Sequence, residues 1–448
     1  MATTLHSSLF RATCVGILST LLACGGGGGA GTSVPFGGSN PAAGNPPHDV
    51  TITAVTVNPV SYWNDVATTT INVAATATGS PAEQRPITTT DLATVHIAIY
   101  DAVVAITGTH RPFAVTPSRP ASGTDASEAA AIGAAAYGVL KGLFPARADQ
   151  YQAPYDRFVA TLTGSDAARD AGLALGTEIA NGVLSLRAND GRSVVLAPYV
   201  PGTGPGQFRG LNPINRFLPA VKPFSMLSSS QFRVPAPPTL DSGTYAQDFN
   251  ETRTLGGTVS SLRTDAQLEI GRFHTEPPPR FWPRNLRKFI MTDRSLTDHA
   301  RLMAMLMVAQ ADAEIGCFES KYFYQFWRPQ SAIPLAAADG NDATVADAAW
   351  TPVVPTPNHP EYPAAHACVA GAVTEIMTAF YGTDRVAFTF DSTVTNSTHS
   401  FDSVSALVDE IRWARIYGGM HFRSALMQGH ALGTNVARQV ALNHFQPL

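Results

Sequence analysis

A long apolar segment in the C-terminal third of the chain limits the possible folds more than any other feature. Ser295-Leu296-Thr297-Asp298 matches a capping box, the pattern with which many helices begin. The residues that follow, Ala300–Ala311, are apolar on nearly every side of that helix. A surface helix carries a single apolar stripe, so this pattern predicts a central helix that other elements surround.

The remaining periodic segments are also helical. Apolar residues recur at three- and four-residue spacing, which predicts helices over the ranges Asp91–Ile106, Ser127–Leu143, Ala148–Leu162, Asp166–Leu186, Asp248–Leu255 and Thr264–Arg272, the last followed by the breaker Pro277-Pro278-Pro279. Short connections between helices are typical of bundles. We therefore expect an all-α fold of helical bundles.

Two segments do not fit this helical pattern. Tyr199–Leu240 is rich in Pro and Gly and has little periodicity, which predicts a long loop lying over the bundle. Val50–Gly79 is rich in Thr and Val and favours short strands, although Trp63-Asn64-Asp65 could equally begin a helix. The 448 residues carry a net charge of −4, so no nucleic-acid surface is predicted.

Lys321 and Arg328 lie at the end of the long apolar segment, in the run CFESKYFYQFWR. We expect the helix to run to Trp327 and to stop at Arg328, because Pro329 disfavours helix at the residue before it. Seven residues make roughly two turns, which places both cations on one face. Two cations that point the same way from a helix rich in aromatic residues suggest a binding site for an anion. The alternative is a surface pair whose aliphatic stems cover apolar neighbours.

Two later segments also contain basic residues at structural breaks. Pro363-Ala364-Ala365-His366 stands where a helix running to about Phe380 should begin, and unpaired N–H groups at a helix N-terminus attract anions. Arg415 and His421 flank Gly418-Gly419, which separates the last two predicted helices. Three segments of the C-terminal third thus supply basic side chains.

Taken together, Lys321-x6-Arg328-Pro329, Pro363-Ala364-Ala365-His366 and Arg415-x5-His421 resemble the signature of the vanadium-dependent haloperoxidase and type 2 phosphatidic acid phosphatase superfamily. That signature reads Lys-x6-Arg-Pro, Pro-Ser-Gly-His and Ser-Arg-x5-His-x3-Asp. Order and basic positions agree, and the similarity extends over roughly Asp91 to Gly433. The resemblance implies a helical haloperoxidase/phosphatase-like domain over residues 49–448, with its active-site part at about 294–448.

The resemblance also implies a role for each residue. Lys321, Arg328, Arg415 and Ala365 would hold the oxygens of a vanadate or phosphate ion, because Arg offers planar forks and Lys a point charge. His421 would bond the central atom, as the metal ligand of vanadate or as a phosphohistidine nucleophile. His366 would act as the acid and base.

The chain departs from the signature at four positions. Ala364 and Ala365 replace Ser and Gly in the second part, and Ala414 and Ala425 replace the Ser and Asp of the third. The missing Ser hydroxyl removes one hydrogen bond to the oxyanion, worth about 1 to 2 kcal/mol. The missing Asp at 425 leaves His421 without its usual orienting partner.

Three functions are therefore considered. The leading one is a haloperoxidase that holds vanadate as cofactor and oxidises a halide with hydrogen peroxide. The second is a cofactor-free phosphatase acting on phosphate monoesters or lipid phosphates. The third is an oxyanion-binding protein without catalysis. His359-x-Glu361 resembles part of a zinc deaminase motif, but no Pro-Cys-x-x-Cys follows it.

The N-terminus predicts export. Arg11 precedes an apolar run that ends Leu21-Leu22-Ala23-Cys24, which resembles the lipobox of bacterial lipoproteins. We expect residues 1–24 to be a signal peptide with Cys24 as the lipidation site, and 25–48 to be a flexible Gly/Pro-rich tether. The lipid would hold the protein on a membrane facing the periplasm or cell exterior. Since an exported protein can form disulfides, Cys317 and Cys368 are predicted to pair.

Overall fold

The computed structural model describes residues 50–52, 58–71, 89–119, 121–260, 262–291 and 293–448. The predicted signal peptide, its Cys24 and the tether lie outside the described residues. The helices are α1 Pro59–Ile71, α3 Thr89–Thr107, α4 Glu128–Leu143, α5 Ala148–Val159, α6 Asp166–Arg187, α7 Gly243–Gly256, α8 Asp265–Phe273, α9 Pro278–Leu286, α10 Leu296–Tyr324, α11 Pro329–Ala332, α12 Ala365–Tyr381, α13 Val404–Tyr417 and α14 Arg423–Asn443.

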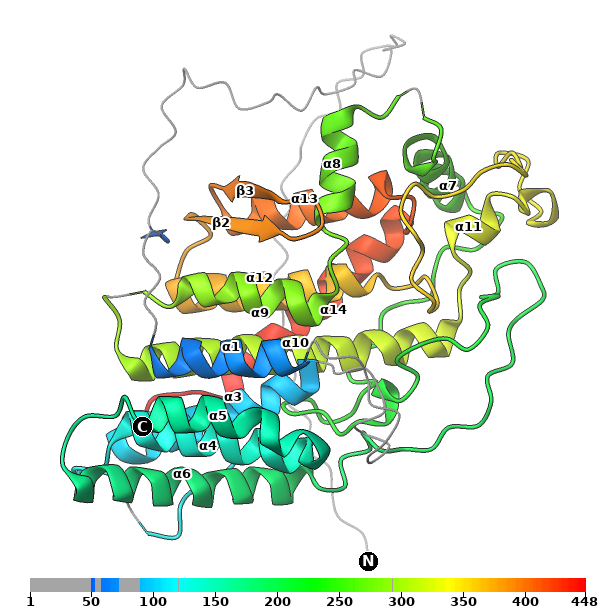
Figure 1. Cartoon of the computed structure of the whole chain (residues 1–448). Coiled ribbons are helices and arrows are strands. Elements are labelled where there is room, and N and C mark those ends of the chain that lie inside the picture. The colour runs from blue at the N-terminus through cyan, green and yellow to red at the C-terminus, as the bar shows by residue number, and fades with distance from the viewer. Residues whose placement is uncertain (1–49, 53–57, 72–88, 120, 261, 292) are drawn as a thin grey trace, which may run out of the picture. The chain divides into compact units, whose positions relative to one another are not determined.

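Helix α10 is the centre of the described fold, as predicted. It begins with a complete capping box between Ser295 and Asp298, and every residue from Leu302 to Lys321 is buried. It packs against α3 on one side and against α12 and α14 on the other (Figure 1). The helix therefore joins an N-terminal group, α3 to α6, to a C-terminal group, α12 to α14.

Small residues allow the helices within each group to approach closely. A Cβ atom added at Gly433 of α14 would lie 1.9 Å from the carbonyl oxygen of Cys368 in α12, and one at Gly429 would lie 2.6 Å from that of Ala364. Glycine is needed at both positions because any side chain there would overlap the facing backbone. This close packing holds the beginning of α12, where His366 lies, against α14.

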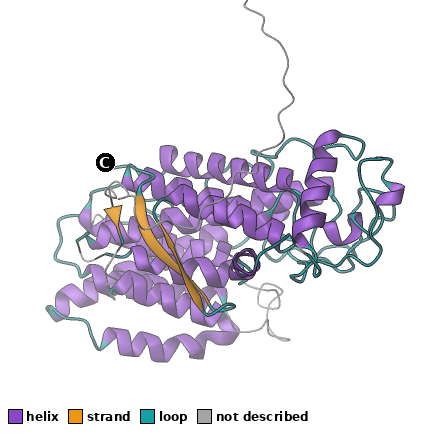
Figure 2. Ribbon diagram, turned by 90° about the horizontal axis from the view of Figure 1, so that it is seen from above, coloured by secondary structure: helices purple, strands orange, loops and turns teal. Residues whose placement is uncertain are grey.

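The predicted helical-bundle fold is confirmed, and a small sheet accompanies it (Figure 2). β2 (Val386–Ser392) pairs antiparallel with β3 (Ser397–Phe401), with Phe390 opposite His399, and β1 (Val50–Thr51) pairs parallel with β2. Of the two structures considered for Val50–Gly79, both occur in part: the short strand β1 and the helix α1 around Trp63.

The long Pro/Gly-rich segment is a loop, as predicted, interrupted by the 3-10 turn Leu218–Ala220 and by an isolated β-bridge between Gln207 and Phe326. Further 3-10 turns lie at Pro145–Arg147, Arg287–Phe289 and Ala336–Ala338. α3 is long and apolar enough to cross a membrane by composition, but 94% of its apolar window is buried inside the protein, as befits a core helix.

Candidate active site

The end of α10 differs from the prediction. The helix stops at Tyr324, because Gln325 takes a left-handed conformation with φ 48° and its N–H closes the last turn on the carbonyl of Lys321. Arg328 lies beyond this turn as the residue before α11. The expectation that Lys321 and Arg328 share one helix face is therefore wrong. The turn brings both instead to the same loop, residues 359–363, which precedes α12.

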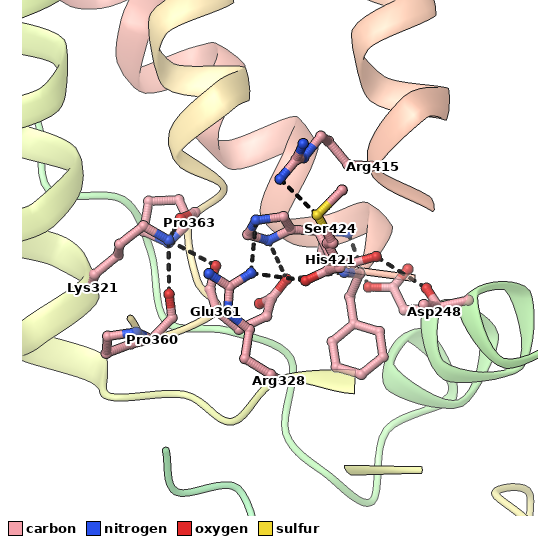
Figure 3. A network of polar contacts seen from close by, with 12 residues as sticks. Asp248, Lys321, Arg328, Pro360, Glu361, Pro363, Arg415, His421 and Ser424 are labelled. Carbon is pink, nitrogen blue, oxygen red and sulfur yellow. Dashed lines mark hydrogen bonds and ion pairs between the residues drawn. The ribbon is translucent and has the colours of Figure 1, made fainter. Parts of the chain in front are cut away.

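Lys321 is fully buried and forms its hydrogen bonds with backbone carbonyls of the protein. Its Nζ donates to the carbonyl oxygens of Pro360 at 2.8 Å and Glu361 at 3.0 Å, and also to that of Pro363. An ammonium has three hydrogens, so these bonds use all of its donors. Burial lowers the pKa of Lys321 to about 8, which still leaves it mostly charged at neutral pH. Lys321 thus holds the loop in place (Figure 3).

Arg328 connects three segments of the chain. Its Nε donates to the carbonyl of His359 at 2.8 Å, and its Nη1 donates to the carbonyl of Met420 at 2.8 Å and to Nε2 of His421 at 2.9 Å. Nη2 lies 3.0 Å from Nδ1 of His359. Burial lowers the pKa of Arg328 to about 10, so the guanidinium remains charged.

His421 is held from both sides of its ring. Nδ1 lies 2.9 Å from Oε1 of Glu361, and the same oxygen accepts the N–H of Phe422 at 2.9 Å. Burial lowers the pKa of His421 well below its ordinary value, and the nearby cations lower it further. Because the ring is neutral and an arginine can only donate, Nε2 must be the acceptor and Nδ1 must carry the proton. The lone pair of Nε2 is thereby turned toward the cations.

His366 is the second residue of α12 and lies in the first turn of that helix, where the backbone N–H groups have no side-chain cap. The preceding Ala364 has the extended backbone of an N-cap but no side chain that could cap the first turn. Nε2 of His366 is buried without a hydrogen-bond partner. Burial lowers the pKa of His366 well below its ordinary value, with Arg415, Arg328 and Lys321 adding to the shift. The ring is therefore neutral.

Arg415 lies in the last turn of α13. Nη1 donates to the carbonyl of His274 at 3.0 Å and Nη2 to the sulfur of Met420 at 3.0 Å, whereas Nε is buried without a partner. Burial and the charge of Arg328 lower the pKa of Arg415 to about 9. Met420 accepts from Arg415 through its sulfur and from Arg328 through its carbonyl, and Arg328 also bonds to His421. His366 lines one cavity with His359, the residue that Arg328 contacts, so the five predicted basic side chains lie close to one another.

A cavity of about 300 Å³ reaches this cluster. Its lining includes His366, His359 and Ala365 beside apolar groups such as Phe318 and Pro277 to Pro279. A larger cavity, about 450 Å³, lies by α1 and α5, but its lining holds no histidine or carboxylate. We take the smaller cavity as the approach to the site because His366 lines it.

The predicted bridge between Cys317 and Cys368 is absent from the structure. Both are free cysteines and fully buried, and Sγ of Cys317 donates to the carbonyl of Pro363 at 3.8 Å. Burial raises the pKa of the Cys368 thiol well above its ordinary value. Disulfide formation proceeds through a thiolate, so an apolar site that keeps the thiol protonated does not favour it.

Glu361 is the site residue that the sequence analysis missed. It was noticed in a rejected zinc motif and in the stretch of wider similarity, but it was given no role, although it lies two residues before the second signature segment. The signal that could have found it is the missing Asp at 425, because a catalytic histidine without its usual acidic partner needs another one. Glu361 is the fully buried acid that occupies this place next to His421.

Comparisons with known proteins agree with the fold. The VCPO second helical-bundle domain matches residues 301–447. Vanadium chloroperoxidase of Curvularia inaequalis is 30% identical over 124 residues, which covers 23% of this chain and 20% of that protein. The alignment thus spans about a fifth of that relative's length.

Solved structures cover nearly the whole chain. A bacterial vanadium-dependent iodoperoxidase superposes with a TM-score of 0.69 and 20% identity, covering 88% of this chain and 99% of that one. The holo form of a bacterial vanadium-dependent chloroperoxidase gives a TM-score of 0.64 and 14% identity, with 87% and 97% covered. At these identities the similarity establishes the fold.

Proposed function

We propose that this chain, which carries the helical-bundle domain of the vanadium haloperoxidase family on residues 301–447, oxidises a halide ion with hydrogen peroxide at vanadate bound to His421. The observation that carries the proposal is the state of His421. Its Nε2 lone pair is free of a proton, faces Arg328, and lies among three buried cations. A neutral nitrogen ligand surrounded by positive charge suits an anionic metal oxide.

The charge balance of the site supports an anionic guest. Lys321, Arg328 and Arg415 are each at most 1% exposed, whereas the nearby buried acid Glu361 bonds to His421 and has its pKa raised by burial to about 7. Burying charge without compensation costs several kcal/mol per ion, so a bound oxyanion would stabilise this cluster.

Vanadate fits the donors that remain free. Nε of Arg415 and Nε2 of His366 are buried without partners, and the first turn of α12 has no side-chain cap. These groups would surround the oxyanion, with His421 Nε2 as the bond to the metal. Lys321 would contribute indirectly, by holding the loop of residues 359–363 in place. When bound, vanadate supplies the activation of hydrogen peroxide toward the halide.

His366 is placed to handle protons. Converting halide and hydrogen peroxide into hypohalous acid and water consumes one proton for each turnover. A neutral imidazole that lines the cavity can take a proton from incoming peroxide and return it to the departing oxygen.

A paired assay tests the proposal. Purified protein is freed of vanadate, then assayed for peroxide-dependent oxidation of iodide and bromide with and without added vanadate, and for release of phosphate from an aryl ester in vanadate-free buffer. We expect halide oxidation only with vanadate. Phosphate release without halide oxidation would make the protein a phosphatase. Neither activity, with vanadate still raising the melting temperature, would leave an oxyanion-binding protein.

We further propose that the chain is an exported lipoprotein anchored through Cys24. The support is the sequence Leu21-Leu22-Ala23-Cys24 followed by a Gly-rich stretch. Detergent-phase partition of expressed protein tests this. Wild type should enter the detergent phase and Cys24→Ser should not, whereas equal partition would contradict the anchor.

A further inference from the structure

His421 lacks the acidic partner expected four residues further along the chain. Position 425 is a fully buried alanine whose carbonyl accepts the N–H of Ala364. A histidine that must present one nitrogen to a ligand needs its other nitrogen held, since a rotating or wrongly protonated ring cannot bind. The structure shows which group holds it.

We infer that Glu361, on the loop before α12, is the positioning residue of His421 and stands in for the Asp absent at position 425. This rests on the proposed function of His421 as the vanadate ligand. Oε1 of Glu361 accepts from Nδ1 of His421 at 2.9 Å, and the pair is fully buried. Burial raises the pKa of Glu361 to about 7, and above that pH its carboxylate can only accept, so it fixes the proton on Nδ1 and leaves Nε2 bare.

Two independent contacts keep Glu361 in this position. Its Oε1 also accepts the N–H of Phe422, which ties the carboxylate to the residue directly after His421. Its backbone carbonyl accepts from Nζ of Lys321, which ties the loop to the end of α10. Glu361 is therefore tied to the chain through one carboxylate oxygen and through its backbone carbonyl, while Oε2 is buried without a partner.

Asp248, another acid near Glu361, does not compete for this role. Asp248 of α7 accepts the N–H of Ser424 at 3.0 Å, beyond His421 in the chain, and does not bond to the ring (Figure 3). Asp248 thus anchors the beginning of α14, while Glu361 contacts the imidazole itself.

The test compares a variant that loses the carboxylate at position 361 with a variant that carries it at position 425 instead. Glu361→Gln keeps the shape and removes the charge, and Glu361→Gln/Ala425→Asp returns a carboxylate at the signature position. The control, Asp312→Asn, neutralises another fully buried carboxylate, one that accepts backbone N–H groups of Phe224, Ser225 and Met226. Each variant is checked for folding by its melting temperature.

The readouts are the vanadate dissociation constant, measured by calorimetry, and the protonated nitrogen of His421, measured by ¹⁵N NMR on vanadate-free protein. We expect Glu361→Gln to weaken vanadate binding about 10- to 100-fold and to remove the preference for Nδ1–H. The double variant should regain part of the affinity, and the control should match wild type.

Any of three results would overturn the inference. The first is a Glu361→Gln protein that binds vanadate within twofold of wild type and keeps Nδ1–H. The second is a double variant that binds no better than Glu361→Gln. Because the NMR measurement needs no vanadate, it also tests Glu361 in wild type: protonation at Nε2 would refute the role even if the protein bound no vanadate and the proposed function failed.

Discussion

Arg328 donates a hydrogen bond from Nη1 to Nε2 of His421 over 2.9 Å, so the nitrogen proposed to bind vanadium is held by an arginine proposed to bind its oxygens. An entering oxyanion would separate the two without leaving either unpaired. Nε2 would gain the central atom, and the guanidinium would gain an oxygen in place of the ring nitrogen.

This relationship makes Arg328 a sensitive position. Arg328→Met should weaken vanadate binding by about 1.5 to 3 kcal/mol, the value of a hydrogen bond to a charged group, or roughly 10- to 150-fold. Calorimetric titration measures it. Arg438→Met, which removes a 60%-exposed arginine paired with Glu375, is the control and should bind normally. Equal affinity in both variants would contradict the assigned role of Arg328.

Ala364→Ser should restore a missing group. Ala364 has N-cap geometry at the beginning of α12, with φ −76° and ψ 119°, and lacks a side-chain cap. A serine there should tighten vanadate binding roughly 10-fold by a hydrogen bond worth about 1 to 2 kcal/mol. Ala372→Ser, another fully buried alanine of the same helix, serves as the control. Unchanged vanadate affinity in Ala364→Ser would show that the hydroxyl is not the missing group.

Gly433→Ala should disturb the packing of α14 on α12. Its Cβ would stand 1.9 Å from the carbonyl oxygen of Cys368, so the helices must separate, at a cost of about 1 to 3 kcal/mol in the free energy of unfolding. Gly243→Ala is matched to it, since nothing lies within 4 Å of its added Cβ, and should change that energy by at most about 0.5 kcal/mol. Urea unfolding compares them. Equal stability of the two variants would refute the close-packing argument.

A cluster at the sheet should make stability depend on pH. Glu410 lies 2.8 Å from both His274 and His399, and His399 also lies 2.8 Å from Glu269. Burial alone would raise the pKa of Glu410, but the hydrogen bonds from the two histidines outweigh it and lower the pKa to about 2. Burial alone would lower the pKa of His399, but its bonds to the two glutamates raise it above the ordinary value.

The direction of each pKa shift determines how the stability of the protein changes with pH. The contribution of Glu410 is present above about pH 4.3 and is lost as the pH falls toward 2. That of His399 is complete below about pH 6.5 and is lost as the pH rises through its folded pKa. The substitution His399→Gln should therefore lower the melting temperature most between about pH 4.3 and about pH 6.5. Melting temperatures measured across this pH range test the prediction. A loss independent of pH would leave only the stacking of His399 on Phe273.

The sequence predicted the parts of the fold that follow from local periodicity. Ser127 caps α4 and the capping box opens α10, because these contacts depend on residues three positions apart. The end of α10 was misplaced because aromatic residues up to Trp327 continue the helical pattern, and the left-handed turn at Gln325 has no glycine to mark it. Pro277-Pro278-Pro279 was interpreted as a breaker only, although proline also suits the first turn of a helix, and α9 begins at Pro278.

The candidate site was predicted as a group of basic residues but not in its internal contacts. The three motifs identify the residues that come together in the site. That Lys321 bonds to loop carbonyls and that Glu361 holds His421 depends on the path of residues 359–363, which no periodicity encodes. Contacts between residues far apart in sequence remain outside what local patterns can predict.

The most direct test of the central claim is a calorimetric titration of vanadate into wild type, His421→Ala and His430→Ala. His430 is the matched control, a histidine of α14 whose pKa burial also lowers but which lines a different cavity, with Glu375 and Arg412. We predict one vanadate bound to wild type and to His430→Ala, and none to His421→Ala. Equal binding by His421→Ala, or no binding by wild type, would contradict a vanadate site at His421.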